Sequence, residues 1–301
     1  MSLSAEDALT AANEAFGRHP GHRALHARGT LLKGTFTATP EAAALTRAAH
    51  MQGEPVPVTV RVSNGSGDPG SGDHVPDVRG LAIKFYLLDD SRTDLVMQTA
   101  PRFPVHTPEA FLELVRAQKR TRSAFWRLPV FLLRHPGAAV RLPANTWGLL
   151  PPESYATCSY YAIHAFRFVG AGGEARFVRY TLLPDAGERH LNPLRARRLG
   201  PQYLQQEIRR RLDSAPVRFT LQLQVAAPDD EVDDPASDWP AERQRVNAGT
   251  LELTGLDTER ETGDDVLVFD PTRVCVGIEL SADPVLRYRS PAYRASVAER
   301  T

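Results

Sequence analysis

The chain has 301 residues, of which 42% are hydrophobic and 24% charged, which allows a sizeable core and argues against global disorder. Lys plus Arg and Asp plus Glu both total 36, so zero net charge gives no overall attraction to nucleic acid or acidic membranes. The most apolar stretch, residues 125–133, is short and contains Arg127 and Pro129, which excludes a membrane span. Two cysteines, Cys158 and Cys275, are too few for a disulfide framework or a four-cysteine zinc site.

Capping residues and alternating valines define the predicted elements of the first part of the chain. Ser4 is a candidate N-cap, and Pro40 and Pro108 suit the first position of a helix. Four valines between residues 56 and 62 occupy every second position, which indicates a strand with one apolar face. In chain order, the predicted elements are a helix over 4–18, a helix over 40–50, a strand over 56–65, a strand over 80–87 and a helix over 108–120.

The second part of the chain follows a poorly patterned middle, roughly residues 121–160, that is rich in Arg, Pro and Leu. Two alternating runs then surround the glycine-rich turn at 170–173 and predict a β-hairpin. An acidic, proline-containing segment is expected to be a solvated surface loop. In chain order, the elements are strands over 160–169 and 175–182, a helix over 202–213, a strand over 216–225, the acidic loop 226–242, a strand over 248–254, a short run at 266–269 and a helix after Asp283-Pro284.

The order of these elements favours one fold class. Strands are numerous, and the helices cluster at several points instead of alternating regularly with strands. This pattern predicts an α+β fold with an antiparallel sheet or barrel, and it argues against a doubly wound sheet. The sequence shows no internal repeat and no clean linker, so we predict a single domain over 1–301.

One glycine motif matches a nucleotide-binding pattern without its context. Gly65-x-Gly67-x-x-Gly70 follows a predicted strand, as the dinucleotide-binding fingerprint requires. That fingerprint also needs a helix to begin at the third glycine, because the helix N-terminus holds the pyrophosphate. Asp68 and Pro69 continue a loop instead, so we interpret this segment as a plain loop.

Arg289 and Tyr293 are four residues apart, so on the C-terminal helix they share one face, and Arg300 follows on that face seven residues later. A guanidinium and a ferric ion both favour the anionic form of a phenol, and phenolate is a hard oxygen ligand for haem iron. The alternative to an iron ligand is that Arg289 simply packs on Tyr293 at the surface of the helix. Pro291 is expected to kink this helix, or to restart it with Ser290 as the new cap.

Polar side chains near the N-terminus offer a second set of candidates. Arg61 and Ser63 share the strand face opposite the valines, and this face is either part of a site or simply solvent-exposed. His26 follows Arg23 by three residues, and an imidazole with an ordinary pKa of about 6.5 suits proton transfer. A lone histidine in a loop can equally be structural.

Several segments carry a family resemblance through their order, residue types and spacing. They are Arg23-Ala24-Leu25-His26-Ala27-Arg28-Gly29, Val60-Arg61-Val62-Ser63, Asp77-Val78-Arg79-Gly80, Lys84-Phe85-Tyr86, Phe269-Asp270-Pro271, Gly277-Ile278-Glu279, Asp283-Pro284 and Arg289-x-x-x-Tyr293. Over about residues 20–300 the chain resembles the haem catalase superfamily in its minimal form, the catalase-related peroxidases. The resemblance implies a catalase-like antiparallel β-barrel with surrounding helices, and haem b (ferric iron protoporphyrin IX) buried between barrel and helices.

The resemblance also implies a role for each residue of these motifs. Tyr293 would bind the iron, and Arg289 would support its anionic character. His26 would move the proton of a bound peroxide, and Ser63 would fix the tautomer of its ring. Among cofactor-binding residues, the resemblance implies Arg23, Arg61 and Arg300 as propionate partners and Phe111 as an aromatic on the distal haem face.

The sequence departs from the family pattern at Gln98, which stands where catalases place a distal asparagine. Glutamine keeps the amide donor but adds a methylene, so the donor reaches a different point and fast dismutation of hydrogen peroxide is not expected. Which of Met97, Gln98 and Thr99 faces the haem stays open, because a one-residue slip exchanges the two strand faces. Asp77 matches an acid in the substrate channel, with an ion pair to a nearby arginine as the alternative.

The resemblance implies a haem peroxidase that reduces organic hydroperoxides, and hydrogen peroxide with weak catalase activity, using a small organic electron donor. The short segment after Tyr293 predicts tolerance of bulkier hydroperoxides. Two alternatives are an enzyme that rearranges fatty-acid hydroperoxides, similar to the allene oxide synthases, and a barrel that binds haem without turnover. We expect a monomer or small homo-oligomer. We also expect a cytoplasmic location, since the first twenty residues show no secretory pattern.

Overall fold

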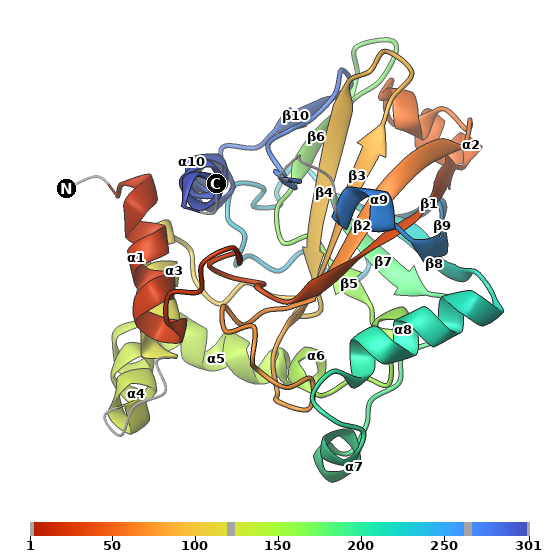
Figure 1. Ribbon diagram of the computed structural model, residues 1–301. Coiled ribbons are helices and arrows are strands. Elements are labelled where there is room, and N and C mark those ends of the chain that lie inside the picture. Colours follow the sequence, from red (N-terminus) through yellow and green to blue (C-terminus); the bar gives the residue numbers. More distant parts are fainter. Residues whose placement is uncertain (1–2, 119–123, 262–266, 300–301) are drawn as a thin grey trace.

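The computed structural model describes residues 3–118, 124–261 and 267–299, so Arg300 lies outside the described residues (Figure 1). The helices are α1 (Ala5–Phe16), α2 (Pro40–Ala43), α3 (Pro108–Ala117), α4 (Ala124–Arg134), α5 (Pro136–Ala144), α6 (Thr146–Leu149), α7 (Pro193–Arg198), α8 (Tyr203–Ser214), α9 (Thr258–Glu261) and α10 (Pro284–Ala298). The strands are β1 (Gly29–Ala38), β2 (Val56–Asn64), β3 (Arg79–Tyr86), β4 (Arg92–Gln98), β5 (Tyr160–Tyr161), β6 (Phe166–Val169), β7 (Ala175–Pro184), β8 (Val217–Val225), β9 (Arg245–Leu256) and β10 (Ile278–Leu280).

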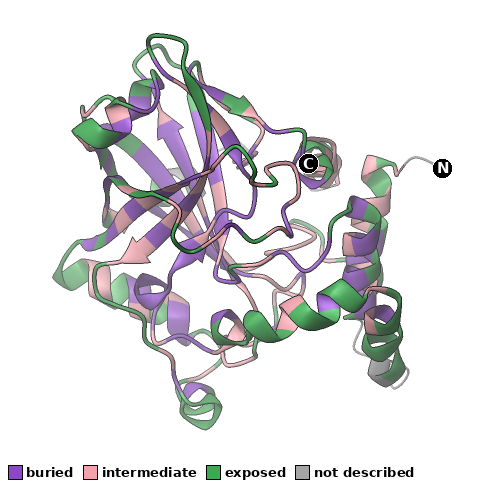
Figure 2. Ribbon diagram, turned by 180° about the vertical axis from the view of Figure 1, so that it is seen from behind, coloured by how far each residue is buried: buried purple, intermediate pink, exposed green. Residues whose placement is uncertain are grey.

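Antiparallel strands form a closed barrel in the order β7-β5-β4-β3-β2-β1-β9-β8, and β8 pairs back onto β7. The β6 and β10 strands extend the sheet beside β7. The predicted α+β class with an antiparallel barrel is therefore confirmed. Figure 2 shows that the barrel strands are largely buried, whereas many loops and outer helices are exposed.

The two faces of β2 show how the barrel positions a site. Its valines are buried in the large hydrophobic cluster that fills the barrel. Arg61 and Ser63 lie on the opposite, outer face, because successive side chains of a strand point to opposite sides. On this strand, the alternating side chains therefore pack in the core on one face and line the site on the other.

Three helices pack together beside this outer face of the barrel. The α1 helix contacts α3 and α10, and Figure 1 shows α1 and α10 on the same side of the barrel. Ser4 caps α1 in a reciprocal capping box with Asp7, and the hydroxyl of Tyr288 donates to the carbonyl of Ser4 over 2.6 Å. None of the helices within the described ranges is long and apolar enough to cross a membrane.

The structure corrects several predicted elements. The predicted helix over 40–50 is the short α2 followed by a 3-10 turn at Ala49–Met51, because Arg47 donates its backbone N–H to Val169 of β6. The predicted strand over 160–169 is interrupted at 162–165 and becomes β5 and β6. The α10 helix continues through Pro291, and Ser290 accepts a hydrogen bond from Arg294 instead of capping a new helix.

Candidate active site

A large cavity lies between the outer face of β2, β3 and β4 and the helices α1, α3 and α10. It contains about 1480 Å³ of empty space, part of which opens to solvent, and its lining is mostly apolar. His26 and Tyr293 both line it, as do Arg23, Arg61 and Gln98. The structure therefore brings to one cavity residues that are up to 288 positions apart in the sequence, as Ala8 and Ser296 show.

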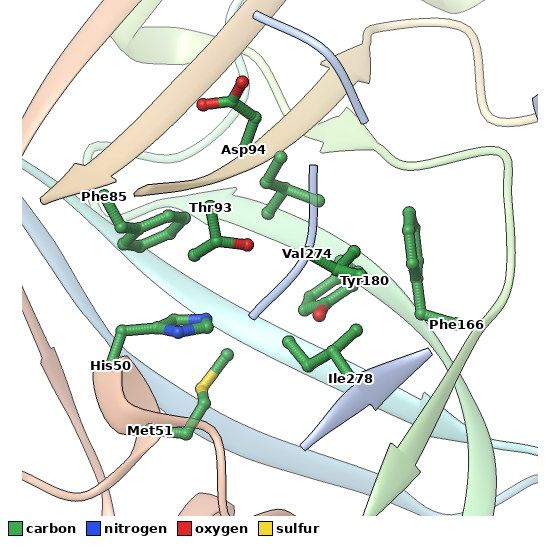
Figure 3. Close-up of a pocket in the computed structure, with 10 residues that line it drawn as sticks. His50, Met51, Phe85, Thr93, Asp94, Phe166, Tyr180, Val274 and Ile278 are labelled. Carbon is green, nitrogen blue, oxygen red and sulfur yellow. The ribbon is translucent and has the colours of Figure 1, made fainter. Parts of the chain in front are cut away.

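A second, much smaller cavity lies inside the barrel (Figure 3). His50, Thr93 and Tyr180 line it together with apolar side chains. None of the predicted site residues lines this space. Burial lowers the pKa of His50 to about 4, so this histidine is neutral at physiological pH.

The backbone of His26 is held in an unusual conformation at the cavity wall. Its φ angle is 55°, in the left-handed region that non-glycine residues rarely adopt. The N–H of His26 donates to the carbonyl of Gly65 over 3.0 Å, and that of Ala27 donates to Ser66 over 3.0 Å. Arg61 donates from Nη2 to the carbonyl of His26 over 2.9 Å. These contacts fix the direction in which the imidazole leaves the backbone.

The imidazole of His26 is neutral and oriented. Its Nδ1 lies 3.0 Å from Ser63 Oγ in a hydrogen bond, and its remaining accessible surface faces the cavity. Burial and the charges of Arg61, Arg289 and Arg23 lower the pKa of His26 to about 3 from the ordinary 6.5. A neutral imidazole whose Nδ1–H donates to Ser63 leaves Nε2 free to accept a proton.

Ser63, Gly80 and Gln98 form a row across three neighbouring strands. Ser63 pairs with Gly80, and Gly80 pairs with Gln98. The imidazole of His26 lies directly over Gly80, since a Cβ there would be 2.8 Å from its Nδ1 and Cε1. Sequence reasoning assigned no role to this glycine, although it stands within the Asp77–Gly80 motif.

The structure separates Thr99 from the other two candidates among residues 97–99. Met97 and Gln98 line the cavity, whereas the hydroxyl of Thr99 donates to the carbonyl of Gly148. The amide of Gln98 donates from Nε2 to the carbonyl of Ala100 over 3.3 Å. Gln98 therefore places its amide at the cavity wall, on the same barrel face as Ser63.

The phenol of Tyr293, on α10, is held at the cavity by a chain of polar contacts. Arg289 donates from Nε to Tyr293 Oη over 2.9 Å, and its Nη1 lies 3.1 Å from His164 Nε2. The Nδ1 of His164 lies 2.6 Å from Asp283 Oδ2. The other carboxylate oxygen of Asp283 accepts from the first two N–H groups of α10, at Val285 and Leu286.

His164 connects the carboxylate of Asp283 to the guanidinium of Arg289 and so helps to position Arg289. Burial, opposed by the hydrogen bond to Asp283, lowers the pKa of His164 to about 4, so the ring is neutral. Its Nδ1–H donates to Asp283, and its Nε2 accepts from Arg289. Sequence reasoning missed His164. A histidine in an otherwise alternating apolar run was the available signal.

The remaining predicted residues divide between the cavity and its surroundings. Arg23 donates from Nη2 to the carbonyl of Leu267 over 2.6 Å and lies 5.8 Å from the ring centroid of Phe269. Phe111 of α3 lines the cavity beside Phe103. Asp77 is not among the lining residues. It accepts from the backbone of Ser66 and pairs with Arg79, so the ion-pair alternative holds.

The donor set fits a haem. Tyr293 of α10 and His26, whose ring lies over Gly80 of β3, both line one mostly apolar cavity, as do Arg23 and Arg61. Flat apolar macrocycles with carboxylate arms need this combination of apolar walls and cations. The Gly65–Gly70 segment is a loop and does not begin a helix, as predicted.

Comparisons with known proteins agree with this geometry. The family model described as Catalase matches residues 11–301. The chain is 47% identical over 299 residues to a protein of Mycolicibacterium paratuberculosis named catalase-related peroxidase, covering 99% of this chain and 95% of that one. A protein of the same name from Synechococcus elongatus is 31% identical over 306 residues, covering 99% and 89% of the two chains.

Solved structures show the same fold. The structure of a fungal catalase matches with a TM-score of 0.82 at 25% identity, over 94% of this chain. This chain spans 60% of that catalase. The family model covers nearly the whole sequence, and the relatives align over almost their full length. The chain belongs to the catalase family of haem-binding oxidoreductases.

Proposed function

We propose that this protein is a haem b peroxidase, formed by a single domain, that reduces organic hydroperoxides and, more weakly, hydrogen peroxide. The observation that supports the proposal is that His26, from the loop over β3, and Tyr293, from α10, line the same cavity. The relatives named catalase-related peroxidase support the same activity. The hydroperoxide ROOH becomes ROH and water, and a small organic donor supplies two electrons and two protons.

The proximal wall would hold the cofactor through Tyr293. Arg289 donates a hydrogen bond to the phenol oxygen, which favours the anionic form that binds iron. When bound, the haem supplies the redox-active iron at which the peroxide O–O bond is cleaved. Arg23, Arg61 and Arg300 would bind the propionates, and Phe111 would pack against the macrocycle.

The distal wall would perform the proton transfers. His26 accepts the proton of the hydroperoxide at Nε2 and then returns it to the leaving oxygen, which departs as the alcohol. Ser63 would accept from Nδ1–H, since the two atoms lie 3.0 Å apart, and this would leave Nε2 as the proton acceptor. The neutral state of His26 makes it competent for this step at physiological pH.

Gln98 would orient the bound peroxide with its amide. Its longer side chain places the donor differently from an asparagine, which disfavours a second hydrogen peroxide as reductant and leaves the oxidised centre to an organic donor. The mostly apolar lining favours organic over inorganic peroxides.

The test compares His26→Ala with His22→Ala, an exposed histidine of the same loop. With tert-butyl hydroperoxide and a phenolic donor, His26→Ala should keep its haem content and lose about 10²- to 10⁴-fold in rate. His22→Ala should match the wild type. Equal rates for His26→Ala and wild type would refute the assignment. Conversion of a fatty-acid hydroperoxide without any donor would refute the peroxidase reaction.

A further inference from the structure

The outer side of α4 and α5 carries a concentration of exposed apolar side chains. Six of the ten large hydrophobic residues that are exposed among the described residues lie between positions 126 and 147. Trp126 is 68% exposed, Leu133 83% and Val140 74%. Figure 1 shows α4 at the outer margin of the molecule, away from the barrel. We call the surface formed by Trp126, Val130, Leu133 and Val140 the α4–α5 face.

Three exposed apolar residues of α4 form one stripe, and a fourth, Leu128, is 40% exposed on another side of the helix. Trp126, Val130 and Leu133 follow the i, i+4, i+7 spacing that places side chains on one side of a helix. The opposite side of the same helix supplies the core, where Phe131 is buried, and Ala138 of α5 is buried beside it. The helix is thus apolar on both sides, and packing of the core explains only the inner one.

The charged residues of this segment are all arginines, and a carboxylate from outside it, that of Glu113 on α3, lies 3.1 Å from His135 Nε2. Residues 124–149 contain three arginines, Arg127, Arg134 and Arg141, and no aspartate or glutamate. Arg127 and Arg134 are exposed. Residues 124–149 are therefore basic and apolar, although the whole chain has zero net charge. Such a surface complements anionic headgroups together with the acyl region beneath them.

A second copy of the chain fits this surface less well. A two-fold interface places the same patch of each copy against the other, so the arginines of one copy would face those of its partner. Residues 124–149 hold no carboxylate to balance them, and that of Glu113 is already engaged by His135. Like charges brought together across an interface oppose association.

We propose that the α4–α5 face docks on an anionic lipid bilayer. The α4 helix spans 11 residues, too few to cross a membrane, so it would lie in the interface with Trp126 and Leu133 inserted among the headgroups. Tryptophan and arginine are suited to this position, because each combines an apolar body with a polar end.

The docking surface and the cavity are separated by little protein. Phe131, on the inner side of α4, belongs to the same hydrophobic cluster as Phe103 and Ile163, and both of these line the cavity. Docking would therefore hold the cavity near acyl chains, in which organic hydroperoxides form. This use of the surface rests on the proposed function, whereas the docking itself does not.

The test measures co-sedimentation of the full chain with two kinds of vesicle. One kind contains phosphatidylcholine alone, and the other contains phosphatidylglycerol as well. Binding should require phosphatidylglycerol and should weaken with salt. Leu133→Ser should weaken binding about tenfold, and Arg134→Gln about fivefold. Leu88→Ser is the control, because Leu88 is 102% exposed and lies in the turn after β3.

Binding measured without turnover keeps this test independent of the peroxidase proposal. Absence of binding to phosphatidylglycerol vesicles would overturn the inference, as would equal weakening by Leu88→Ser and Leu133→Ser. Size-exclusion chromatography supplies the competing outcome. A dimer in the wild type that becomes a monomer in Leu133→Ser would assign the α4–α5 face to a second copy and would also overturn the proposal.

Discussion

Gly80→Ala should displace the imidazole of His26 without unfolding the barrel. The new Cβ would stand 2.8 Å from His26 Nδ1 and Cε1 and 2.8 Å from Ser63 Oγ, whereas ordinary contacts begin at 3.4 Å. The ring must therefore move by about 0.6 Å (3.4 minus 2.8). The hydrogen bond of the His26 backbone to Gly65 prevents the loop from moving with it.

The expected cost follows from this displacement. A misplacement of about 1 Å in an active site can cost about 10²-fold in rate, so about 0.6 Å should lower kcat/KM for an organic hydroperoxide between tenfold and a hundredfold. The loss of stability should stay within the about 1–3 kcal/mol typical of local overpacking. Haem content, read from the absorbance spectrum, should remain close to that of the wild type.

Gly255→Ala is the matched control, because it adds the same methyl group to another barrel strand. Its Cβ would meet only the flexible end of Lys33, at 3.7 Å. We expect wild-type kinetics and slightly raised stability, since alanine restricts the unfolded chain. The reasoning fails if Gly80→Ala retains wild-type kcat/KM, or if the two variants lose activity equally.

Three further predictions concern the buried histidines and their partners. Because the pKa of His26 is lowered to about 3, stopped-flow rates with a hydroperoxide should stay flat between about pH 5 and about pH 8, and a midpoint near the ordinary 6.5 would contradict this. Burial also lowers the pKa of His50 to about 4 from 6.5, so the unfolded chain takes up this proton first and stability falls as the pH drops below 6.5. In urea unfolding, the free energy of unfolding of the wild type should fall by about 2 kcal/mol more than that of His50→Phe between about pH 6.5 and about pH 5. The same pH dependence in both proteins would contradict this prediction. Asp283→Ala removes the cap of α10 and the acceptor of His164, and should lower the free energy of unfolding by about 2 kcal/mol, whereas wild-type stability would show that this carboxylate is dispensable.

Local patterns predicted the elements whose two sides differ. In β8, buried residues alternate with more accessible ones, and in β2 valines alternate with polar residues and a proline; both strands were predicted. The β4 strand was not predicted, because buried residues at 93–95 follow one another without alternation. The α4 helix was not predicted either. Apolar residues lie on both of its sides, so its sequence lacks the amphipathic pattern that indicates a surface helix.

The site was predictable where the family resemblance names residues, and not where it depends on contacts between distant segments. His26, Tyr293 and Gln98 were identified from their motifs and line one cavity. His164 contacts Asp283, which is 119 positions away in the sequence, so no local pattern reveals the pair. The role of Gly80 likewise depends on a loop that folds over its strand.

The central claim is that the phenol of Tyr293 binds the iron of a haem. Titration of ferric haem into the haem-free protein tests it, with absorbance as the readout. Tyr288→Phe is the control, because Tyr288 lies on the same helix, lines the same cavity and donates its hydroxyl to Ser4. We predict that Tyr293→Phe loses the phenolate-ligated ferric spectrum or binds haem far more weakly, while Tyr288→Phe retains both. Identical spectra and affinities for Tyr293→Phe and the wild type would contradict the claim.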